Sequence, residues 1–228
     1  MEKIRRRIIM ILIKPSFEIM DIMGGSHRLE PLRLIEIAGR TCYKSEDKIT
    51  EDSSKKFVET ILKRGHESVI EHSAMTVKFI CDRGVTHELV RHRLCAFSQE
   101  STRYCNYKGG VTFVIPPWVD FKPGEYLMDY NIPMSVVEQS AEWFRAVIES
   151  EFHYLRLLNK EWTPQQARAV LPNSTKTEIV VTANFREWRH IFKLRCSKAA
   201  HPQMRELMIP LHKKCTELIP IIFDDIKV

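Results

Sequence analysis

The stretch RHRLCAFSQESTRY, residues 91–104, gathers guanidinium, imidazole and hydroxyl groups within one short segment of this chain. It holds three arginines, one histidine and three serine or threonine hydroxyls. A guanidinium group offers a planar fork of donors that fits phosphate oxygens two at a time, and Ser and Thr add short neutral donors. The second half of the stretch has little apolar surface to bury and many donors, which favours an anion-binding site over a solvated basic segment.

The residues just before this loop, 85–93, are predicted to form a short helix. Glu88 lies three positions before Arg91 and four before His92, so a carboxylate and two basic groups would share one helix face. A solvated basic helix is the usual outcome for such a run of charges. A nucleic-acid-binding protein that uses residues 85–103 is therefore the rival function, with steep salt dependence as its signature. No nucleic-acid partner is expected, because basic and acidic residues alternate along most of the chain and no standard nucleic-acid motif is present.

The composition is that of an ordinary globular protein with a basic balance. The 228 residues are 44% hydrophobic and 28% charged, and the formal net charge is +6 at pH 7. This charge suits anionic partners without distinguishing nucleic acid from small phosphorylated ligands. The opening, residues 1–13, has too short an apolar run for a signal peptide, and no run approaches the roughly 20 residues of a membrane span. With six scattered cysteines and no Cys-x-x-Cys pair, we expect reduced thiols, a cytoplasmic location and no membrane partner.

The hydrophobic pattern predicts an α/β (α+β) fold, a single domain over residues 1–228 with a mixed or antiparallel sheet packed against several helices. No Gly-x-Gly-x-x-Gly motif is present, so a Rossmann fold is not expected. Residues 118–133 carry no predicted element, and 177–184 fit either a strand or the start of a helix. Strands are predicted at 1–13, 73–81 and 111–115, and helices at 31–39, 51–63, 135–159, 164–171, 185–196 and from 202 toward 218 with an interruption at Pro210.

The predicted helix 185–196 carries an arginine where an apolar residue would be expected. Arg195 continues the face that holds Trp188 and Ile191. Burying an unpaired guanidinium is costly, so Arg195 either reaches outward or is held for a ligand.

The segment 65–72 places two imidazoles and two carboxylates close together in the sequence. His66 and His72 are six positions apart and no third ligand is obvious, so no metal site is expected. Two interpretations of this segment are about equally good. Its polar side chains could hydrogen-bond the end of a helix, or the segment could be a ligand-binding loop. A metal-dependent hydrolase built on His66, His72 and His92 is the weakest of the functions considered.

The chain resembles the flavin-dependent thymidylate synthases. Arg-His-Arg at 91–93, seven residues, and then Ser101-x-Arg103 match the signature of that family without a gap, and the motif is long and chemically unusual. The resemblance extends over about residues 39–205. Three further segments resemble family motifs in the same order: the His-Glu-Ser loop at 66–68, the Ala-Arg-x-x-Leu-Pro segment at 167–172 and the helix Asn-x-Arg-x-Trp-Arg-His at 184–190, which leads to Arg195.

The resemblance implies an enzyme that converts dUMP to dTMP, with 5,10-methylenetetrahydrofolate as carbon donor, FAD as redox cofactor and NADPH as reductant. It also implies a homotetramer whose active sites are each built from several subunits. Nothing in the sequence shows the flavin directly. The implied dUMP-binding residues are Glu88, Leu89, Val90, Arg91, Gln99, Glu100, Ser101, Thr102, Arg103, Arg168 and Arg195. The implied FAD-binding residues are Ser68, Arg91, His92, Arg93, Gln99, Asn184, Phe185, Arg186 and His190.

Arg195 is the residue expected to be catalytic. A guanidinium beside O2, N3 or O4 of a uracil would stabilise the negative charge that develops when the ring is activated. Ser101 is expected to donate to phosphate, because a serine nucleophile needs an oriented base and the nearest imidazole, His92, would by resemblance face the flavin. Two positions depart from the family pattern: Glu88 stands where many members carry Gln, and Ala96 where they often carry Ser.

Overall fold

The computed structural model describes residues 9–23, 30–127 and 136–228, and the chain divides into two compact units. The expectation of a single domain stays a prediction. No helix in the described part of the chain is long and apolar enough to cross a membrane. Unit 1 comprises Met1–Ser16, Ile80–Leu89 and Gln99–Ile179, and unit 2 comprises Phe17–Phe79, Val90–Ser98 and Val180–Val228.

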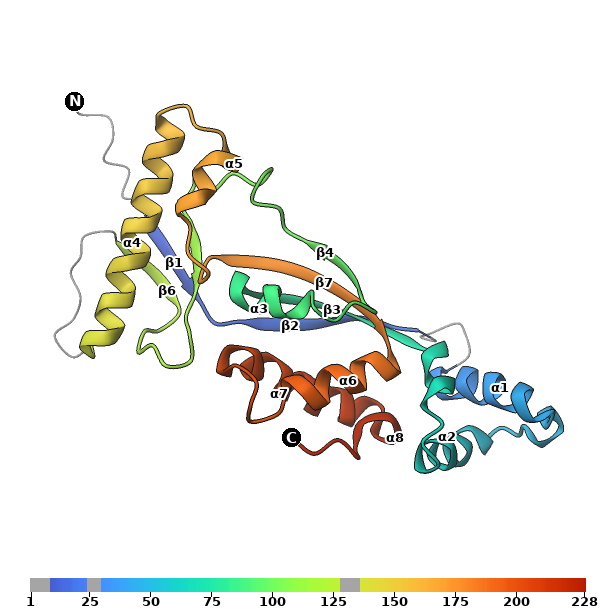
Figure 1. The fold of residues 1–228 in the computed structure, drawn as a ribbon. Helices are drawn as coiled ribbons and strands as arrows, with labels where there is room; N and C mark the ends of the chain where they lie inside the picture. Colours follow the sequence, from blue (N-terminus) through green and yellow to red (C-terminus); the bar gives the residue numbers. More distant parts are fainter. Residues whose placement is uncertain (1–8, 24–29, 128–135) are drawn as a thin grey trace. The chain divides into compact units, whose positions relative to one another are not determined.

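Unit 1 is built on a mixed three-stranded sheet in the order β5-β1-β6. β1 (Ile9–Ile13) pairs in parallel with β5 (Thr112–Val114) and antiparallel with β6 (Gly124–Leu127). α4 (Glu138–Asn159) lies beside β1 and β6 (Figure 1). The expected mixed sheet is confirmed, and β6 is an addition in a segment for which no element was predicted.

The core of unit 1 forms between this sheet and α4. Phe121 stacks on Phe144 with ring centroids 4.5 Å apart. α4 begins later than predicted, because Val137 precedes it with non-helical backbone and is 55% exposed, and residues 128–135 lie outside the described part. The buried side chains include Met10, Leu12, Phe113, Phe144, Val147, Ile148, Tyr154 and Leu158.

One carboxyl group, that of Glu151 on α4, is fully buried in this apolar core. Its Oε1 accepts the N–H of Val111 at 2.7 Å, and among the described residues none hydrogen-bonds its Oε2. Burial raises the pKa of Glu151 to about 7, and the Val111 hydrogen bond opposes that shift. Glu151 therefore titrates near neutral pH.

The second sheet has the strand order β2-β3-β7-β4. Buried and half-buried side chains alternate along β3 (Ala74–Asp82) and β7 (Lys176–Asn184), as expected for strands with one face on a core. This alternation decides the ambiguous segment 177–184 in favour of a strand. The other two strands, β2 (Ser16–Ile22) and β4 (Ala96–Gln99), were not among the predicted elements.

In unit 2, α6 (Phe185–Arg195), α7 (Pro202–Leu218) and α8 (Pro220–Phe223) pack together (Figure 1). Trp188 of α6 is fully buried, and its Nε1–H donates to the backbone oxygen of Met75 at 3.0 Å. This bond joins α6 to β3 and satisfies the polar end of a large buried ring. The predicted helix at 185–196 is thereby confirmed.

α7 runs unbroken through Pro210, so the interruption predicted there was wrong. Proline removes one helical hydrogen bond and strains the turn before it. Leu207, Met208 and Leu211, which flank the proline, are each at most 1% exposed. Their burial outweighs the local cost of the proline.

α1 (Pro31–Tyr43) and α2 (Ser53–Lys63) pack side by side. α1 was predicted to end at Gly39, but it continues to Tyr43 and is capped by Lys44 in the left-handed conformation. A Cβ added at Gly39 would lie 2.6 Å from the Phe57 ring. The glycine therefore permits close packing of the two helices and does not terminate the first.

α3 (Arg83–Leu89) ends before the Arg-His-Arg motif, so the predicted helix 85–93 was too long. Arg91 and Arg93 are exposed while His92 between them is buried. The motif lies in a turn, so the helix face that Glu88 was predicted to share with Arg91 and His92 is not formed. The remaining elements are η1 (Glu46–Lys48), η2 (Glu67–His72), α5 (Pro164–Ala167) and η3 (Arg168–Val170).

Candidate active site

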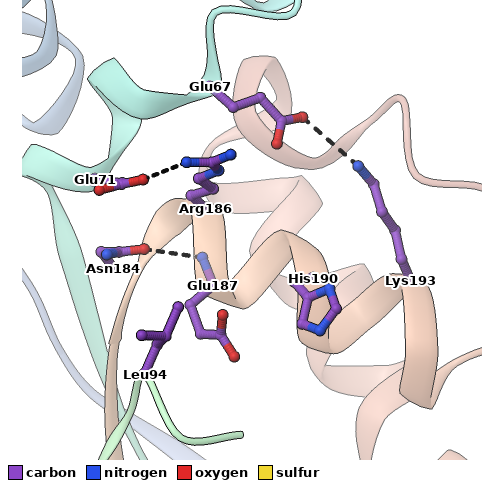
Figure 2. A pocket seen from close by; sticks show the side chains of 8 residues that line it. All are labelled: Glu67, Glu71, Leu94, Asn184, Arg186, Glu187, His190 and Lys193. Atoms are coloured by element: carbon purple, nitrogen blue, oxygen red, sulfur yellow. Dashed lines mark hydrogen bonds and ion pairs between the residues drawn. The ribbon is translucent and has the colours of Figure 1, made fainter.

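A pocket of about 590 Å³ in unit 2 brings together side chains from three segments of the chain (Figure 2). η2 contributes two carboxylates, the turn after α3 contributes a leucine, and the β7–α6 junction and α6 contribute the rest. This volume lies within the range typical of ligand-binding pockets. The lining residues are Glu67, Glu71, Leu94, Asn184, Arg186, Glu187, His190 and Lys193.

The junction between β7 and α6 fixes the polar side chains of this pocket. Asn184 is the N-cap of α6, and its Oδ1 accepts the N–H of Glu187 at 2.9 Å. Asparagine is favoured at this position because its side chain satisfies a helix N–H that has no intrahelical partner. With the start of the helix fixed, Arg186 and His190, four residues apart, both line the pocket.

The pocket carboxylates of η2 are neutralised by neighbouring bases. Glu71 Oε1 accepts a hydrogen bond from Arg186 Nη1 at 2.6 Å (Figure 2). Glu67 Oε1 lies 3.1 Å from Nη2 of Arg189 and 3.6 Å from Nζ of Lys193. Arg186 and Lys193 are about half exposed, and such pairs contribute little to stability, so both cations can turn to an anionic ligand at low cost.

His92 connects the Arg-His-Arg motif to α6. Its Nε2 accepts the Nε–H of Arg195 at 3.0 Å, and its Nδ1 lies 3.4 Å from Oε1 of Glu187. Burial, followed by the charges of Arg195 and His190, lowers the pKa of His92 to about 4. The imidazole is therefore neutral at physiological pH and acts as an acceptor toward Arg195.

Within the described residues, the side chains that could together hold a metal ion are those of His92, Glu187 and His190, whose ligand atoms lie within 4.8 Å of one another. The weak hydrolase alternative had named His66 and His72 as partners of His92. His66 Nδ1 instead bonds the hydroxyl of Tyr43 at 3.0 Å. One nitrogen of His92 already accepts from the Arg195 guanidinium, and a cation at that distance opposes a second positive charge.

The second half of the 91–104 stretch belongs to unit 1 and forms a compact turn. Ser101 Oγ accepts the N–H of Arg103 at 3.3 Å, and the carbonyl of Ser101 accepts the N–H of Cys105 at 2.9 Å. Arg168 Nη1 donates to Oγ1 of Thr102 at 2.9 Å. Arg103 and Arg168 are both exposed, so two guanidiniums lie at this turn and at the segment bonded to it, and the anion site stays a prediction.

Gln99 and Glu100, both predicted to contact ligands, are bonded within unit 1. Gln99 Nε2 donates to the hydroxyl of Thr86 at 2.9 Å. Glu100 Oε1 accepts from the Tyr107 hydroxyl at 2.8 Å, and its Oε2 lies 3.1 Å from Nζ of Lys176. Both oxygens of the Glu100 carboxylate therefore have partners within unit 1, a tyrosine and a lysine of β7.

Burial separates the predicted site residues into two groups. Leu89 and Phe185 are at most 1% exposed, so only their backbone atoms could meet a ligand. The exposed side chains of Ser68, Arg91 and Arg93 do not line the unit 2 pocket.

The predicted site residues are divided between the two units. Unit 1 holds Glu88, Leu89, Gln99, Glu100, Ser101, Thr102, Arg103 and Arg168, and unit 2 holds Ser68, Val90, Arg91, His92, Arg93, Asn184, Phe185, Arg186, His190 and Arg195.

Sequence reasoning missed the part that Glu187 plays. Glu187 contacts His92, which is far from it in the sequence, and no local sequence pattern predicts that contact. One available signal was its place three residues after Asn184, where an acid or amide often accompanies an N-cap. That spacing indicates helix capping and does not predict that the Glu187 side chain contacts His92.

Comparison with known proteins identifies the family. A family model described as thymidylate synthase complementing protein matches residues 26–221. The flavin-dependent thymidylate synthase of Corynebacterium aurimucosum is 36% identical over an alignment of 200 residues, and the match covers 84% of this chain and 78% of that protein. The protein of the same name from Geobacter sulfurreducens is 31% identical over an alignment of 215 residues, and the match covers 90% of this chain and 86% of the relative.

The solved structures agree. The crystal structure of the UMP/dUMP methylase PolB from Streptomyces cacaoi, bound with 5-Br dUMP, matches with a TM-score of 0.71 and 25% identity over 94% of this chain and 95% of that one. The α/β fold class predicted from the sequence is thereby confirmed. The chain belongs to the family of flavin-dependent thymidylate synthases.

Proposed function

We propose that this family member converts dUMP to dTMP, taking the carbon from 5,10-methylenetetrahydrofolate and the reducing equivalents from NADPH by way of FAD. The observation that carries the proposal is the guanidinium of Arg195, half-buried at the end of α6 and bonded through Nε to a neutral imidazole. A cation oriented in advance in this way suits the stabilisation of negative charge on a pyrimidine ring. We also place the enzyme in the cytoplasm, which its six free cysteines support.

Arg195 would act on the uracil through its two terminal nitrogens. Its Nε–H is donated to Nε2 of His92, and the guanidinium also has an edge formed by Nη1 and Nη2. That edge presents parallel N–H donors, the arrangement that matches two adjacent acceptors such as a carbonyl oxygen and a deprotonated ring nitrogen. Arg195 would therefore favour the polarised form of the uracil that attacks the carbon donor.

The phosphate of dUMP would be held by the Ser101 turn. The backbone N–H of Arg103 donates to the side-chain Oγ of Ser101, and Nη1 of the exposed Arg168 donates to Oγ1 of Thr102. Charge-assisted bonds from two guanidiniums and a hydroxyl suit a phosphate dianion. Ser101 has no imidazole bonded to it among the described residues, which favours a donor role over nucleophilic attack.

The unit 2 pocket would hold part of the flavin. Asn184, Arg186 and His190 line it, and all three were expected at the cofactor from the family resemblance. An amide, a guanidinium and an imidazole fit a ligand rich in nitrogen and oxygen acceptors, and the ion-paired Lys193 adds a second cation for a phosphate. The flavin supplies hydride transfer when bound, whereas these side chains bind and orient it.

We further propose that the enzyme is a homotetramer with active sites shared between subunits. Leu94, beside the Arg-His-Arg motif, is 78% exposed, and Tyr104, beside Arg103, is 79% exposed. Large apolar side chains next to polar ligand residues are suited to be covered by another subunit. Light scattering should give four chains, and mixing inactive Arg195→Ala subunits with inactive Arg103→Ala subunits should restore part of the activity. Recovery of none would contradict shared sites.

The proposed function is tested by flavin loading and product analysis. Protein saturated with FAD and then desalted should keep the absorbance of an oxidised isoalloxazine. It should then form dTMP only when dUMP, 5,10-methylenetetrahydrofolate and NADPH are all present, and replacing NADPH by NADH tests the choice of reductant. Protein that stays colourless and leaves FAD fluorescence unchanged would refute the flavin assignment. Salt-sensitive binding to a DNA duplex would then favour the nucleic-acid alternative.

A further inference from the structure

We infer that Glu187 is a positioning residue for the reaction: through Nδ1 of His92 it holds the imidazole so that Nε2 accepts the Nε–H of Arg195 and keeps the guanidinium in one orientation. The inference rests on the proposed function, in which Arg195 acts on the uracil. It concerns the support of that arginine and adds no new step to the reaction.

The hydrogen-bonding capacity of the three groups leaves one consistent arrangement. Nε of arginine is always a donor, so Nε2 of His92, 3.0 Å away, must present its lone pair. The ring proton of a neutral His92 is therefore on Nδ1. That nitrogen lies 3.4 Å from Oε1 of Glu187, a carboxylate that accepts and has no proton to offer when ionised.

Burial protects this arrangement of the His92 and Glu187 side chains from competing water. The side chains of His92 and Glu187 are 4% and 8% exposed, so water competes weakly for either group. The lowered pKa of His92 keeps the ring neutral, and a doubly protonated ring could not accept from Arg195. The contact with Glu187, 3.4 Å from Nδ1, therefore pairs a neutral imidazole N–H with a carboxylate oxygen at a distance longer than an ordinary hydrogen bond, and it does not require an ion pair.

Glu187 and Arg195, the two residues that His92 bridges, both lie on α6, so the helix backbone fixes their positions. Asn184 accepts the Glu187 N–H as the helix cap, which sets the position of Glu187 in the first turn. Arg195 lies eight residues further on, about 12 Å along the axis at 1.5 Å per residue. The His92 ring bridges the two side chains from outside the helix, so a rotation of the ring would release the guanidinium.

The decisive comparison is between Glu187→Gln and Glu187→Ala. Glutamine keeps an oxygen that accepts the Nδ1–H, whereas alanine removes the acceptor and frees the ring to flip. Glu187→Ala should lower kcat roughly tenfold, a fraction of the hundredfold or more that follows loss of an oriented donor, with KM for dUMP changed less. Glu187→Gln should stay within about twofold of the wild type because the acceptor remains.

Glu149→Ala is the matched control. Glu149 lies 3.6 Å from His153 on α4, an exposed acid–imidazole pair like the buried one, and we expect it to leave kcat unchanged. Thermal melts of all three variants confirm folding. A Glu187→Ala enzyme with wild-type kcat would overturn the inference, and so would a Glu187→Gln enzyme as impaired as Glu187→Ala, because charge and not ring orientation would then matter.

A second measurement does not depend on activity. Nitrogen-15-labelled histidine reports the tautomer of each ring, and the His92 signal is assigned by its loss in His92→Gln. In the wild type the proton should sit on Nδ1, and in Glu187→Ala the ring should become a mixture. If the wild type makes no dTMP, the proposed function fails while this result stands. If it makes dTMP and the tautomer is unchanged in Glu187→Ala, the positioning role fails.

A metal ion on the same three side chains is the competing explanation. Titration with Zn²⁺ alone should show no stoichiometric binding to the purified protein, because Arg195 already occupies one ring nitrogen. Stoichiometric zinc that is lost in Glu187→Ala would overturn the inference and assign His92, Glu187 and His190 to a metal site.

Discussion

The Nε–H of Arg195 donates to Nε2 of His92 at 3.0 Å, across 103 positions of the sequence. The bond joins the end of α6 to the middle of the Arg-His-Arg motif. The resemblance assigns His92 to the flavin and Arg195 to the nucleotide, and in the fold the two are direct neighbours. The bond therefore ties the residue assigned to the nucleotide to a residue assigned to the flavin.

Replacing Arg195 by lysine tests its part in turnover. Lysine keeps the charge but loses both the planar fork and the Nε–H that His92 accepts. We expect a loss of about 3 kcal/mol of transition-state stabilisation, roughly a hundredfold in rate, with FAD binding little changed. The checks are dTMP formation at saturating dUMP and FAD titration, with the exposed Arg145→Lys as control. A near-normal rate for Arg195→Lys would rule out the role.

Replacing Ser101 by alanine separates phosphate binding from nucleophilic catalysis. Loss of one hydrogen bond to a charged group costs about 1.5–3 kcal/mol, so dUMP should bind one to two decades more weakly. Turnover should remain measurable at high dUMP. Complete loss of turnover in a variant that still binds FAD and dUMP would identify a nucleophile, as would a dUMP adduct on Ser101 in the mass spectrum of the quenched wild-type reaction.

Glu151 should make the stability of the protein depend on pH. Its folded-state pKa of about 7 lies above the ordinary value of 4.5, so the folded state holds the proton more tightly than the unfolded state. Its contribution is fully present below pH 4.5 and is lost as pH rises to about 7, a fall of about 3 kcal/mol.

Glu151→Gln removes this titration and keeps the acceptor for Val111. Urea unfolding at pH 5 and pH 8 should therefore show a smaller pH difference in the variant than in the wild type. An equal difference in both proteins would mean that Glu151 titrates normally.

Gly39→Ala tests the packing of α1 on α2. The added methyl would meet the Phe57 ring at 2.6 Å, so the helices must separate or the ring must move, at a cost of about 1–3 kcal/mol in the free energy of unfolding. Gly109→Ala is the control, since nothing lies within 4 Å of its Cβ position. Phe57→Leu should relieve part of the loss. Equal stability of the Gly39→Ala protein and the wild type would contradict the packing role.

Local pattern predicted much of the secondary structure. The strands at 73–81 and 111–115 and the helices at 51–63 and 185–196 follow from alternation and amphipathic periodicity, which depend on near neighbours alone. Two of the predictions that failed concern Gly39 and Pro210, residues whose structural effect depends on what packs against them. A glycine can end a helix or admit another one, and only the partner helix distinguishes the two.

The sequence by itself determined the chemical inventory: the arginines and hydroxyls of the 91–104 stretch, the arginine at the end of a buried helix face, and the order of motifs that indicates the family. Only the tertiary structure decided that Glu187 and Arg195 meet on opposite nitrogens of His92, and that Glu100 is held by Tyr107 and Lys176. Periodicity reaches a few residues along the chain. Which side chains meet across tens of positions depends on how the helices and strands pack, because that packing sets the distances at which hydrogen bonds form.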